Sequence, residues 1–293
     1  MFRHMSKAGC LTAALILSAS VCSPCAVAQD VRQVTGNRPA PLDTTAVLSP
    51  ALEEILQNWE QKSAKVSQTK GEFKRVVYDS TWGVAKCSVG VYYYDHPDKG
   101  RMDFTPDKSV VSDPPRTVQR GEVTFKCEAD EARVWICDGE QILDVDPSKK
   151  EYNRVQIPPQ YRGRNISDGP LPFLFGMKAD KMKQRYQLEL GSLHNPENII
   201  HVIARPLFPA EQQEYRSAEV LLDPVTFLPK AIQLAMPGER QTVYIFTKHD
   251  KPTLGFMPGT FKPSLLAFKL INDTTAVVPL ERESKKQDGI LIR

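Results

Sequence analysis

The side chains that could catalyse a reaction are present, but they form no complete catalytic motif. Asp144 and Asp146 are a closely spaced pair of carboxylates, the residue type that glycoside hydrolysis requires. They flank an Asp146-Pro147 turn, however, and aspartates in turns commonly accept hydrogen bonds from the backbone. Neither a Gly-x-Ser-x-Gly nucleophile turn nor a phosphate-binding glycine loop occurs. We therefore expect no catalytic residue and no enzyme, with an unrecognised hydrolase as the remaining alternative.

Metal and thiol chemistry are not indicated either. The histidines at 96, 194, 201 and 249 lie far apart in the sequence, and no cysteine spacing is typical of zinc. Cys137 lacks a predicted basic neighbour or helix N-terminus that would lower its pKa, which favours a buried structural role. We expect no metal and no cofactor.

The N-terminal segment predicts export. Arg3 and Lys7 precede an apolar stretch from 11 to 19, and Ala26-Val27-Ala28 is typical of a signal-peptidase site, so residues 1–28 are predicted to be a signal peptide. Nothing later in the chain offers the run of about 20 apolar residues that a transmembrane helix needs. We expect a periplasmic or extracellular protein. Residues 29–48, rich in Pro, Thr, Gln and Asn, predict a flexible linker.

Three cysteines remain after this cleavage, at 87, 127 and 137. Disulfides persist in exported proteins, but an odd count leaves at least one thiol free or shared between chains. Two alternatives stay open: a Cys87–Cys127 disulfide, which is slightly preferred, and three small buried residues without a bridge.

The elements that must position any site are one helix and a long series of strands. Ser49 is suited to cap a helix, Pro50 to its first turn, and Leu52, Ile55, Leu56, Trp59 and Val66 recur at helical spacing over 51–68. Alternating polarity then predicts strands that present one apolar face. They are expected near 71–79, 84–95, 100–105, 121–128, 132–137, 140–146, 151–157, 186–191, 198–205, 216–223, 228–236 and 240–247. About a dozen strands are too many for a flat sheet, so the sheet is expected to curl.

The series is interrupted between 158 and 185. Two prolines at 158–159 are followed by the run Gly169-Pro170-Leu171-Pro172-Phe173-Leu174-Phe175-Gly176, and then by a short predicted helix from Ala179 to Arg185. The four large apolar side chains of the run show no strand periodicity. They predict a loop that either plugs the core or closes a ligand cavity as a lid. The residues expected to contact an apolar ligand are Leu52, Trp59, Leu171, Phe173, Leu174, Phe175 and Met182.

The formal net charge is +3, and it falls to about +1 without residues 1–28, which contain two basic and no acidic residues. Basic residues are scattered, so no nucleic-acid partner is expected. Residues 263–293 are expected to form a charged, solvated C-terminal tail.

Three blocks of sequence resemble the LolA superfamily of periplasmic lipoprotein carriers. They are Gly90-Val91-Tyr92-Tyr93-Tyr94 with Pro97, Arg101 and Met102, the run from Cys137-Asp138-Gly139 to Asp146, and Pro172-Phe173-Leu174. The resemblance implies a mainly β (α+β) fold: an incomplete antiparallel β-barrel of about 11 strands, covered by an N-terminal amphipathic helix and a short lid helix. Asp95-His96 stands where the carriers have a basic residue before the turn proline; if that basic residue helps to latch the carriers' lid, the latch here must differ.

A second resemblance is to an uncharacterised domain of planctomycete exported proteins. It is carried by Trp135 with Cys137-Asp138-Gly139, the run from Asp168 to Gly176, Arg185-Tyr186, Ala204-Arg205-Pro206 and Phe227-Leu228-Pro229, and it covers 49–262 as one LolA-like domain. That domain has no established activity. The leading hypothesis is a non-catalytic exported carrier or binding module for an apolar ligand such as a lipid or lipoprotein acyl chain. The alternative is an envelope interaction or sensor module whose hollow is filled by its own side chains and which binds an envelope protein.

Overall fold

The computed structural model describes residues 48–159, 162, 173, 178–192, 198–252 and 254–275. These belong to a compact unit, Val47–Arg293, and the predicted signal peptide and linker lie outside the described residues. The first half of the unit contains α1 (Pro50–Ser63), β1 (Gln68–Asp79), β2 (Val84–Asp95), β3 (Lys99–Pro106), a 3-10 turn η1 (Lys108–Val110), β4 (Thr117–Arg120), β5 (Val123–Ala129), β6 (Arg133–Asp138), β7 (Gln141–Asp146) and β8 (Glu151–Gln156). The second half contains α2 (Ala179–Arg185), β9 (Tyr186–Leu190), β10 (Ile200–Pro206), α3 (Pro209–Glu214), β11 (Ser217–Leu222), β12 (Pro229–Met236), β13 (Arg240–Asp250) and β14 (Lys269–Thr275). Within these described ranges, no helix has the length and apolar character needed to span a membrane.

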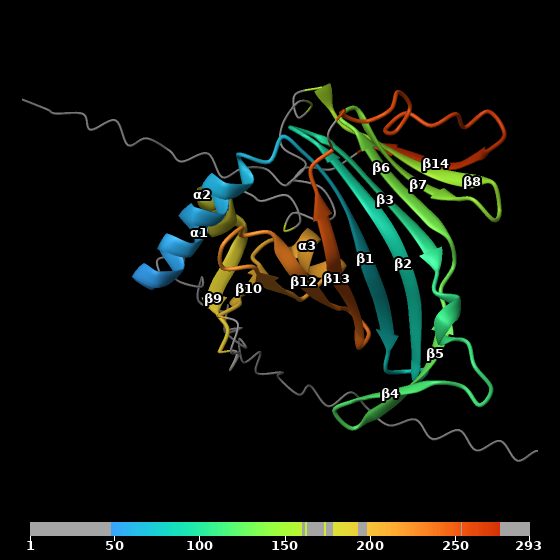
Figure 1. Ribbon diagram of the computed structural model, residues 1–293, viewed down its shortest axis with the longest axis horizontal. Coiled ribbons are helices and arrows are strands. Elements are labelled where there is room, and N and C mark those ends of the chain that lie inside the picture. Colours follow the sequence, from blue (N-terminus) through green and yellow to red (C-terminus); the bar gives the residue numbers. More distant parts are fainter. Residues whose placement is uncertain are drawn as a thin grey trace, which may run out of the picture. The chain divides into compact units, whose positions relative to one another are not determined.

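All strands join one 14-stranded sheet, which Figure 1 shows as a strongly curved surface. Its main path runs β14-β8-β7-β6-β3-β2-β1-β13-β12-β11-β10-β9, and β4 and β5 branch from the start of β2. The path has two free ends, β14 and β9, so the sheet is not closed into a barrel. The predicted fold class, an incomplete β-barrel with few helices, is therefore confirmed, with more strands than the eleven expected.

The alternation of polar and apolar residues along the strands determines which face of the sheet is buried. In β1, residues 69, 71, 73 and 75 are buried and alternate with exposed residues at 70, 72 and 74, as one apolar face requires. The buried face meets α1 and α2 across the main hydrophobic core. A second, smaller core lies between β2, β5 and η1, and a third lies on the opposite face of β6 and β7.

The turns follow their predicted chemistry. In the β6–β7 hairpin, the Asp138 carboxylate accepts backbone hydrogen bonds from Glu140 and Gln141, both at 2.9 Å. Gly139 has a φ of +91°, a conformation that side chains other than glycine rarely adopt. Asp223 accepts backbone hydrogen bonds in the same way before β12.

Three expectations need correction. The first helix ends at Ser63 and not at 68, because the chain turns at Ala64; Val66 still packs against the main core. The strand expected at 121–128 is β5, and β4, the antiparallel strand that precedes it, was not predicted. Residues 269–275 of the expected tail form β14, and α3 was not predicted.

β14 is held almost entirely by polar contacts. It pairs in parallel with β8, and six of its seven residues are exposed. Arg154 binds the Asp273 carboxylate through two nitrogens, and Asn272 donates to Asn153 at 2.8 Å. This edge strand therefore adds no side chain to the main core.

Candidate ligand-binding hollow

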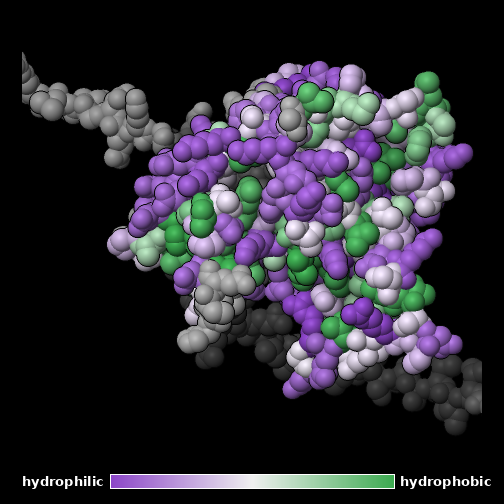
Figure 2. All heavy atoms as spheres, viewed as in Figure 1, coloured by the Kyte–Doolittle hydropathy of each residue, from purple (hydrophilic) through white to green (hydrophobic). Residues whose placement is uncertain are grey.

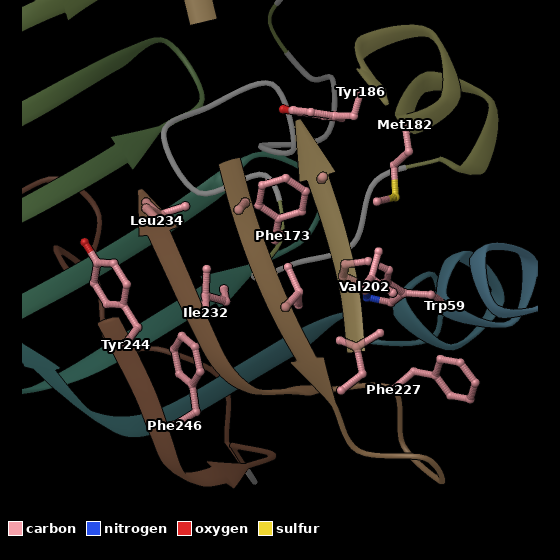
Figure 3. Close-up of a cluster of buried hydrophobic side chains, with 14 of the residues drawn as sticks. Trp59, Phe173, Met182, Tyr186, Val202, Phe227, Ile232, Leu234, Tyr244 and Phe246 are labelled. Atoms are coloured by element: carbon pink, nitrogen blue, oxygen red, sulfur yellow. The ribbon is translucent and has the colours of Figure 1, made fainter. Parts of the chain in front are cut away.

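The wall of the candidate site is the buried face of the sheet. Large aromatic side chains line its β1–β3 and β13 part, and aliphatic side chains line β10–β12 (Figure 3). Phe73 packs edge-on against Phe104, with ring centroids 5.1 Å apart, and Tyr92 packs edge-on against Phe246 at 5.7 Å. Such pairs are favourable aromatic geometries and give the wall a defined shape.

Two glycines make room for these rings. Gly71 pairs with Tyr92 across β1 and β2, and Gly90 pairs with Phe73 in the same ladder. A Cβ atom at Gly90 would lie 2.4 Å from the Phe73 ring, and one at Gly71 would lie 2.4 Å from the Tyr92 ring. Each ring thus lies over the bare backbone of the neighbouring strand.

Helix α1 covers this wall through one stripe of side chains. Leu52, Leu56 and Trp59 are buried, as helical spacing predicted. Ser49 caps the helix as expected, since its hydroxyl accepts a hydrogen bond from the Leu52 backbone at 3.3 Å.

Helix α2 lies beside α1 and is attached to it by polar contacts (Figure 1). The Ala179 backbone N–H donates to the Glu60 carboxylate at 2.9 Å, and Lys183 donates to Glu53 at 2.9 Å. The hydrogen bond from Lys183 lowers the pKa of Glu53. Because both side chains of the Lys183–Glu53 pair are about one-third exposed, this pair stabilises the contact only weakly.

Phe173 inserts into the hollow next to α2. Its side chain is only 1% exposed, and its ring centroid lies 5.3 Å from that of Tyr186. Figure 3 shows the ring between Leu234 on the sheet and Met182 and Tyr186 on the helix side. The predicted loop therefore reaches the core at this residue.

A cluster of buried polar side chains lies beside Phe173. The hydroxyls of Tyr186 and Tyr215 are 2.9 Å apart, and burial raises the pKa of both, that of Tyr215 to about 12. Arg185 donates to the Glu211 carboxylate at 2.8 and 3.0 Å, which joins α3 to the end of α2. These tyrosines are therefore neutral hydrogen-bonding groups and not bases.

The structure brings four of the seven predicted ligand-contacting residues into one cluster. Leu52, Trp59, Phe173 and Met182 are all buried in the main core. The other three belong to the loop that was predicted to act as a plug or a lid, and they lie outside the described residues: Leu171, Leu174 and Phe175.

Buried side chains of the main core pack against one another along the described part of the hollow. A cavity remains beneath the end of α1, lined by Val66, Thr69, Tyr92, Phe227 and His249 among others, and its volume is about 10 Å³. This is room for at most one water molecule. This cavity is too small for an acyl chain.

The polar lining of this small cavity includes a tyrosine–histidine pair, Tyr92 and His249, that the sequence analysis missed. His249 Nε2 lies 3.1 Å from the Pro229 carbonyl, to which it donates, so Nδ1 is left to accept the Tyr92 hydroxyl proton. Burial lowers the pKa of His249 and raises that of Tyr92 to about 12. Both groups are therefore uncharged near neutral pH. The histidine spacing carried no signal for this pair, because the two residues are 157 positions apart and meet only through the β1 register.

The candidate catalytic groups have structural partners. The Asp146 carboxylate accepts backbone hydrogen bonds from Ser148 and Lys149 in the turn, both at 3.1 Å, and the bond from Lys149 lowers its pKa. Asp144 accepts a hydrogen bond from the Trp135 indole at 3.1 Å. No group of three or more potential metal-ligating side chains occurs among the residues that the structure describes.

The cysteines follow the second of the two alternatives. Cys87, Cys127 and Cys137 are free and buried, and Cys87 and Cys127 lie in the same small core without forming a disulfide. Burial raises the pKa of Cys87 and of Cys137 to about 11. These thiols are therefore poor nucleophiles at neutral pH.

Comparisons with solved structures find distant likenesses. No family model matches the chain, and no curated protein matches it. An uncharacterized conserved protein from Thermus thermophilus is 9% identical, with a TM-score of 0.41 over 76% of this chain and 99% of that chain. The MucA/MucB complex of Pseudomonas aeruginosa gives 12% identity and a TM-score of 0.38 over 75% of this chain and 63% of that chain. A LolA superfamily protein from Nitrosomonas europaea gives 7% identity and a TM-score of 0.34 over 70% and 96%. At this distance, function has to be inferred from the residues of this chain.

Proposed function

We propose that this chain is an exported, non-catalytic module that binds an apolar ligand, such as a lipid or a lipoprotein acyl chain, between the sheet and helices α1 and α2. In the proposed mechanism, Phe173 occupies the place that the ligand takes, and the ligand displaces it. The observation that carries this proposal is the position of Phe173, a buried ring that belongs to no strand or helix and enters the hollow beside α2.

The energies of the exchange support displacement. Withdrawing Phe173 and Met182 from the core costs about 1.5–3 kcal/mol for each side chain. The exposed Lys183–Glu53 contact between α1 and α2 adds less than about 1 kcal/mol. Burying ten methylenes of an acyl chain contributes about 8 kcal/mol. The incoming chain can therefore replace the residues that leave.

A second candidate function is an envelope interaction or sensor module with a permanently filled hollow. The packing around the cavity of about 10 Å³ favours it, because a core this tight needs no guest to be complete. In that case the protein binds a partner through its surface and holds no lipid.

Titration with a fluorescent fatty acid separates the two functions. Phe173→Ala removes the displaced ring and is expected to bind the fatty acid about tenfold or more tightly than the unmodified protein, which corresponds to the burial of one phenylalanine side chain. Phe261→Ala is the matched control, because Phe261 is also buried but lies in the core on the opposite face of the sheet. Its affinity for the fatty acid should not change.

Two further measurements make the result decisive. Phenylalanine-to-alanine changes in a core cost about 3–5 kcal/mol, so circular dichroism must show that both variants remain folded. Native mass spectrometry of the purified protein tests for a co-purified lipid. If neither the unmodified protein nor Phe173→Ala binds the fatty acid, and no lipid co-purifies, the carrier proposal is wrong and the filled interaction module is favoured.

A further inference from the structure

The segment between β13 and β14 forms a distinct feature on the face opposite the hollow. We call residues 251–268 the outer loop; all of them except 253 are described. Phe256, Phe261, Leu265 and Phe268 turn inward and pack on the outer face of the sheet, in a cluster with Ile136, Leu143 and Val145. Phe256 packs edge-on against both Tyr93 and Phe261, with centroid distances of 5.7 and 5.6 Å. The outer loop is therefore anchored by its aromatic residues.

Three other apolar residues of the same loop point outward. Leu254 and Leu266 are each 99% exposed, and Met257 is 81% exposed. Figure 2 shows apolar atoms at the surface along the upper right margin, the region where Figure 1 places this segment. Because the aromatic residues hold the loop against the sheet, the exposure of these three side chains is not the result of a loop that has moved away from the sheet.

The charged residues within the outer loop are all basic. The loop contains Lys251 and Lys262, Lys269 follows it, and the flanking acids Asp250 and Asp273 are paired with Lys248 and Arg154. Lys262 has only a distant ion pair with Glu140, at 3.9 Å between exposed side chains, so its charge is little compensated. Outward aliphatic side chains among lysines are typical of segments that lie in the interface of an anionic bilayer.

A polar cleft of about 680 Å³ lies between the outer loop and the sheet. Its charged lining residues are Lys70 on β1, Arg101 and Asp103 on β3, Asp250 and Lys251. Arg101 is paired with Asp103 at 2.7 Å and donates to the Thr260 carbonyl at 2.9 Å, and Asp250 is paired with Lys248. The cleft therefore offers Lys70 and Lys251 beside the exposed apolar residues, where the phosphate of a headgroup with attached acyl chains could contact them.

We propose that the outer loop docks onto the surface of an anionic lipid bilayer. Leu254, Met257 and Leu266 enter the interfacial region, and the lysines contact the headgroup phosphates. A bilayer fits better than a protein partner, because protein interfaces are enriched in aromatic residues and depleted in lysine, whereas this loop turns its aromatics inward and its lysines outward. The inference does not depend on whether the hollow admits a ligand.

Vesicle flotation with the exported, processed protein tests the proposal. Vesicles of phosphatidylcholine alone are compared with vesicles that also contain phosphatidylglycerol, at low and at high salt. Binding is expected to require phosphatidylglycerol and to weaken as salt increases. Lys251→Glu/Lys262→Glu should lower the affinity about thirtyfold or more, since each lysine near an anionic surface contributes about fivefold and its charge is here reversed.

The apolar contribution is tested by Leu254→Ser/Met257→Ser/Leu266→Ser, which should also lower the affinity at least tenfold. The controls are Val225→Ser, at a 71% exposed apolar position in the β11–β12 turn, and Lys108→Glu, at an exposed lysine on η1. Both controls should bind like the unmodified protein. Absence of binding to the anionic vesicles, equal binding to both kinds of vesicle, or equal losses in the controls would overturn the proposal. So would loop-dependent dimerisation in sedimentation experiments without vesicle binding, because a second copy of the chain would then be the occupant.

Discussion

The Gly90→Ala variant tests whether the shape of the inner wall depends on bare backbone beneath an aromatic ring. The added Cβ would lie 2.1 Å from the Asp103 carbonyl oxygen on β3 and 2.4 Å from the Phe73 ring on β1. Both distances are about 1 Å or more shorter than an ordinary van der Waals contact. The Phe73 ring can rotate away, but the Asp103 carbonyl is part of the β2–β3 ladder and cannot move without separating the strands.

The expected cost follows from these two contacts. Overpacking a core typically costs 1–3 kcal/mol, and contact with a fixed backbone atom places Gly90→Ala at about the upper end of this range. Alanine recovers about 0.5–1 kcal/mol, because glycine loses more backbone entropy in a strand. The free energy of unfolding should therefore fall by about 2 kcal/mol, and the Tm by about 4–8 °C for a domain of this size.

Urea unfolding followed by circular dichroism measures this loss. Gly121→Ala is the control, because Gly121 has a φ of +56° but nothing within 4 Å of the added Cβ. It should lose only the strain of a left-handed residue, about 1 kcal/mol. A double variant, Gly90→Ala/Phe73→Leu, should show a coupling energy of about 0.5 kcal/mol or more, since the smaller side chain relieves part of the clash. A Gly90→Ala variant no less stable than Gly121→Ala would show that the sheet accommodates a Cβ here and that the reasoning is wrong.

Three other predictions concern buried polar groups. Asp130→Ala should lower the free energy of unfolding by about 3 kcal/mol, because it leaves the buried Arg75 guanidinium without the carboxylate that lies 2.7 Å away. The control Glu128→Ala breaks the exposed ion pair with Lys126 and should cost less than about 1 kcal/mol. Equal losses of the two variants in urea unfolding would contradict this ranking. Burial raises the pKa of Cys87 and Cys137 from 9.0 to about 11, so the folded state holds these thiol protons more tightly than the unfolded chain does. The free energy of unfolding that they contribute should be fully present below pH 9 and should fall as the pH rises toward 11. Cys87→Ser/Cys137→Ser should flatten this part of the profile of stability against pH, and an unchanged slope would show that these thiols are not its source. Burial lowers the pKa of His249 below 6.5, so the unfolded chain binds a proton at this residue more readily than the folded protein does. The free energy of unfolding should therefore decrease as the pH falls through 6.5 and below. His249→Gln should reduce this decrease, and a decrease as steep as that of the unmodified protein would exclude His249 as its source.

Local sequence signals predicted much of the fold. Ser49 and Pro50 marked the start of α1, the bounds of β2 and α2 were predicted to the residue, and the Asp138-Gly139 turn formed the expected hairpin. The end of α1 was missed because Val66 continues the apolar stripe after the helix has ended at Ser63. β14 was missed because Asn272 and Asp273 are poor strand formers, and they are held by partners about 119 positions away.

The candidate site was predictable in its membership but not in its packing. Helical spacing identified Leu52 and Trp59, and the apolar run identified Phe173. Whether these side chains leave space between them depends on the strand register, which sets Gly71 opposite Tyr92 and Gly90 opposite Phe73. No local pattern contains that information, so the filled hollow could not have been predicted from single segments.

The polar strand β14 also determines how copies of this protein can meet. A terminal strand of a sheet offers unpaired N–H and C=O groups to any other chain, and long apolar edges of this kind promote fibrous aggregation. Here the edge beyond β8 is taken by a short strand whose Asn272, Asp273, Thr274 and Thr275 are all exposed. The short length of β14 and the weak strand propensity of Asn272 and Asp273 disfavour the stacking of one molecule on the next. β14 thus keeps a large open sheet dispersed at this edge without contributing to its interior.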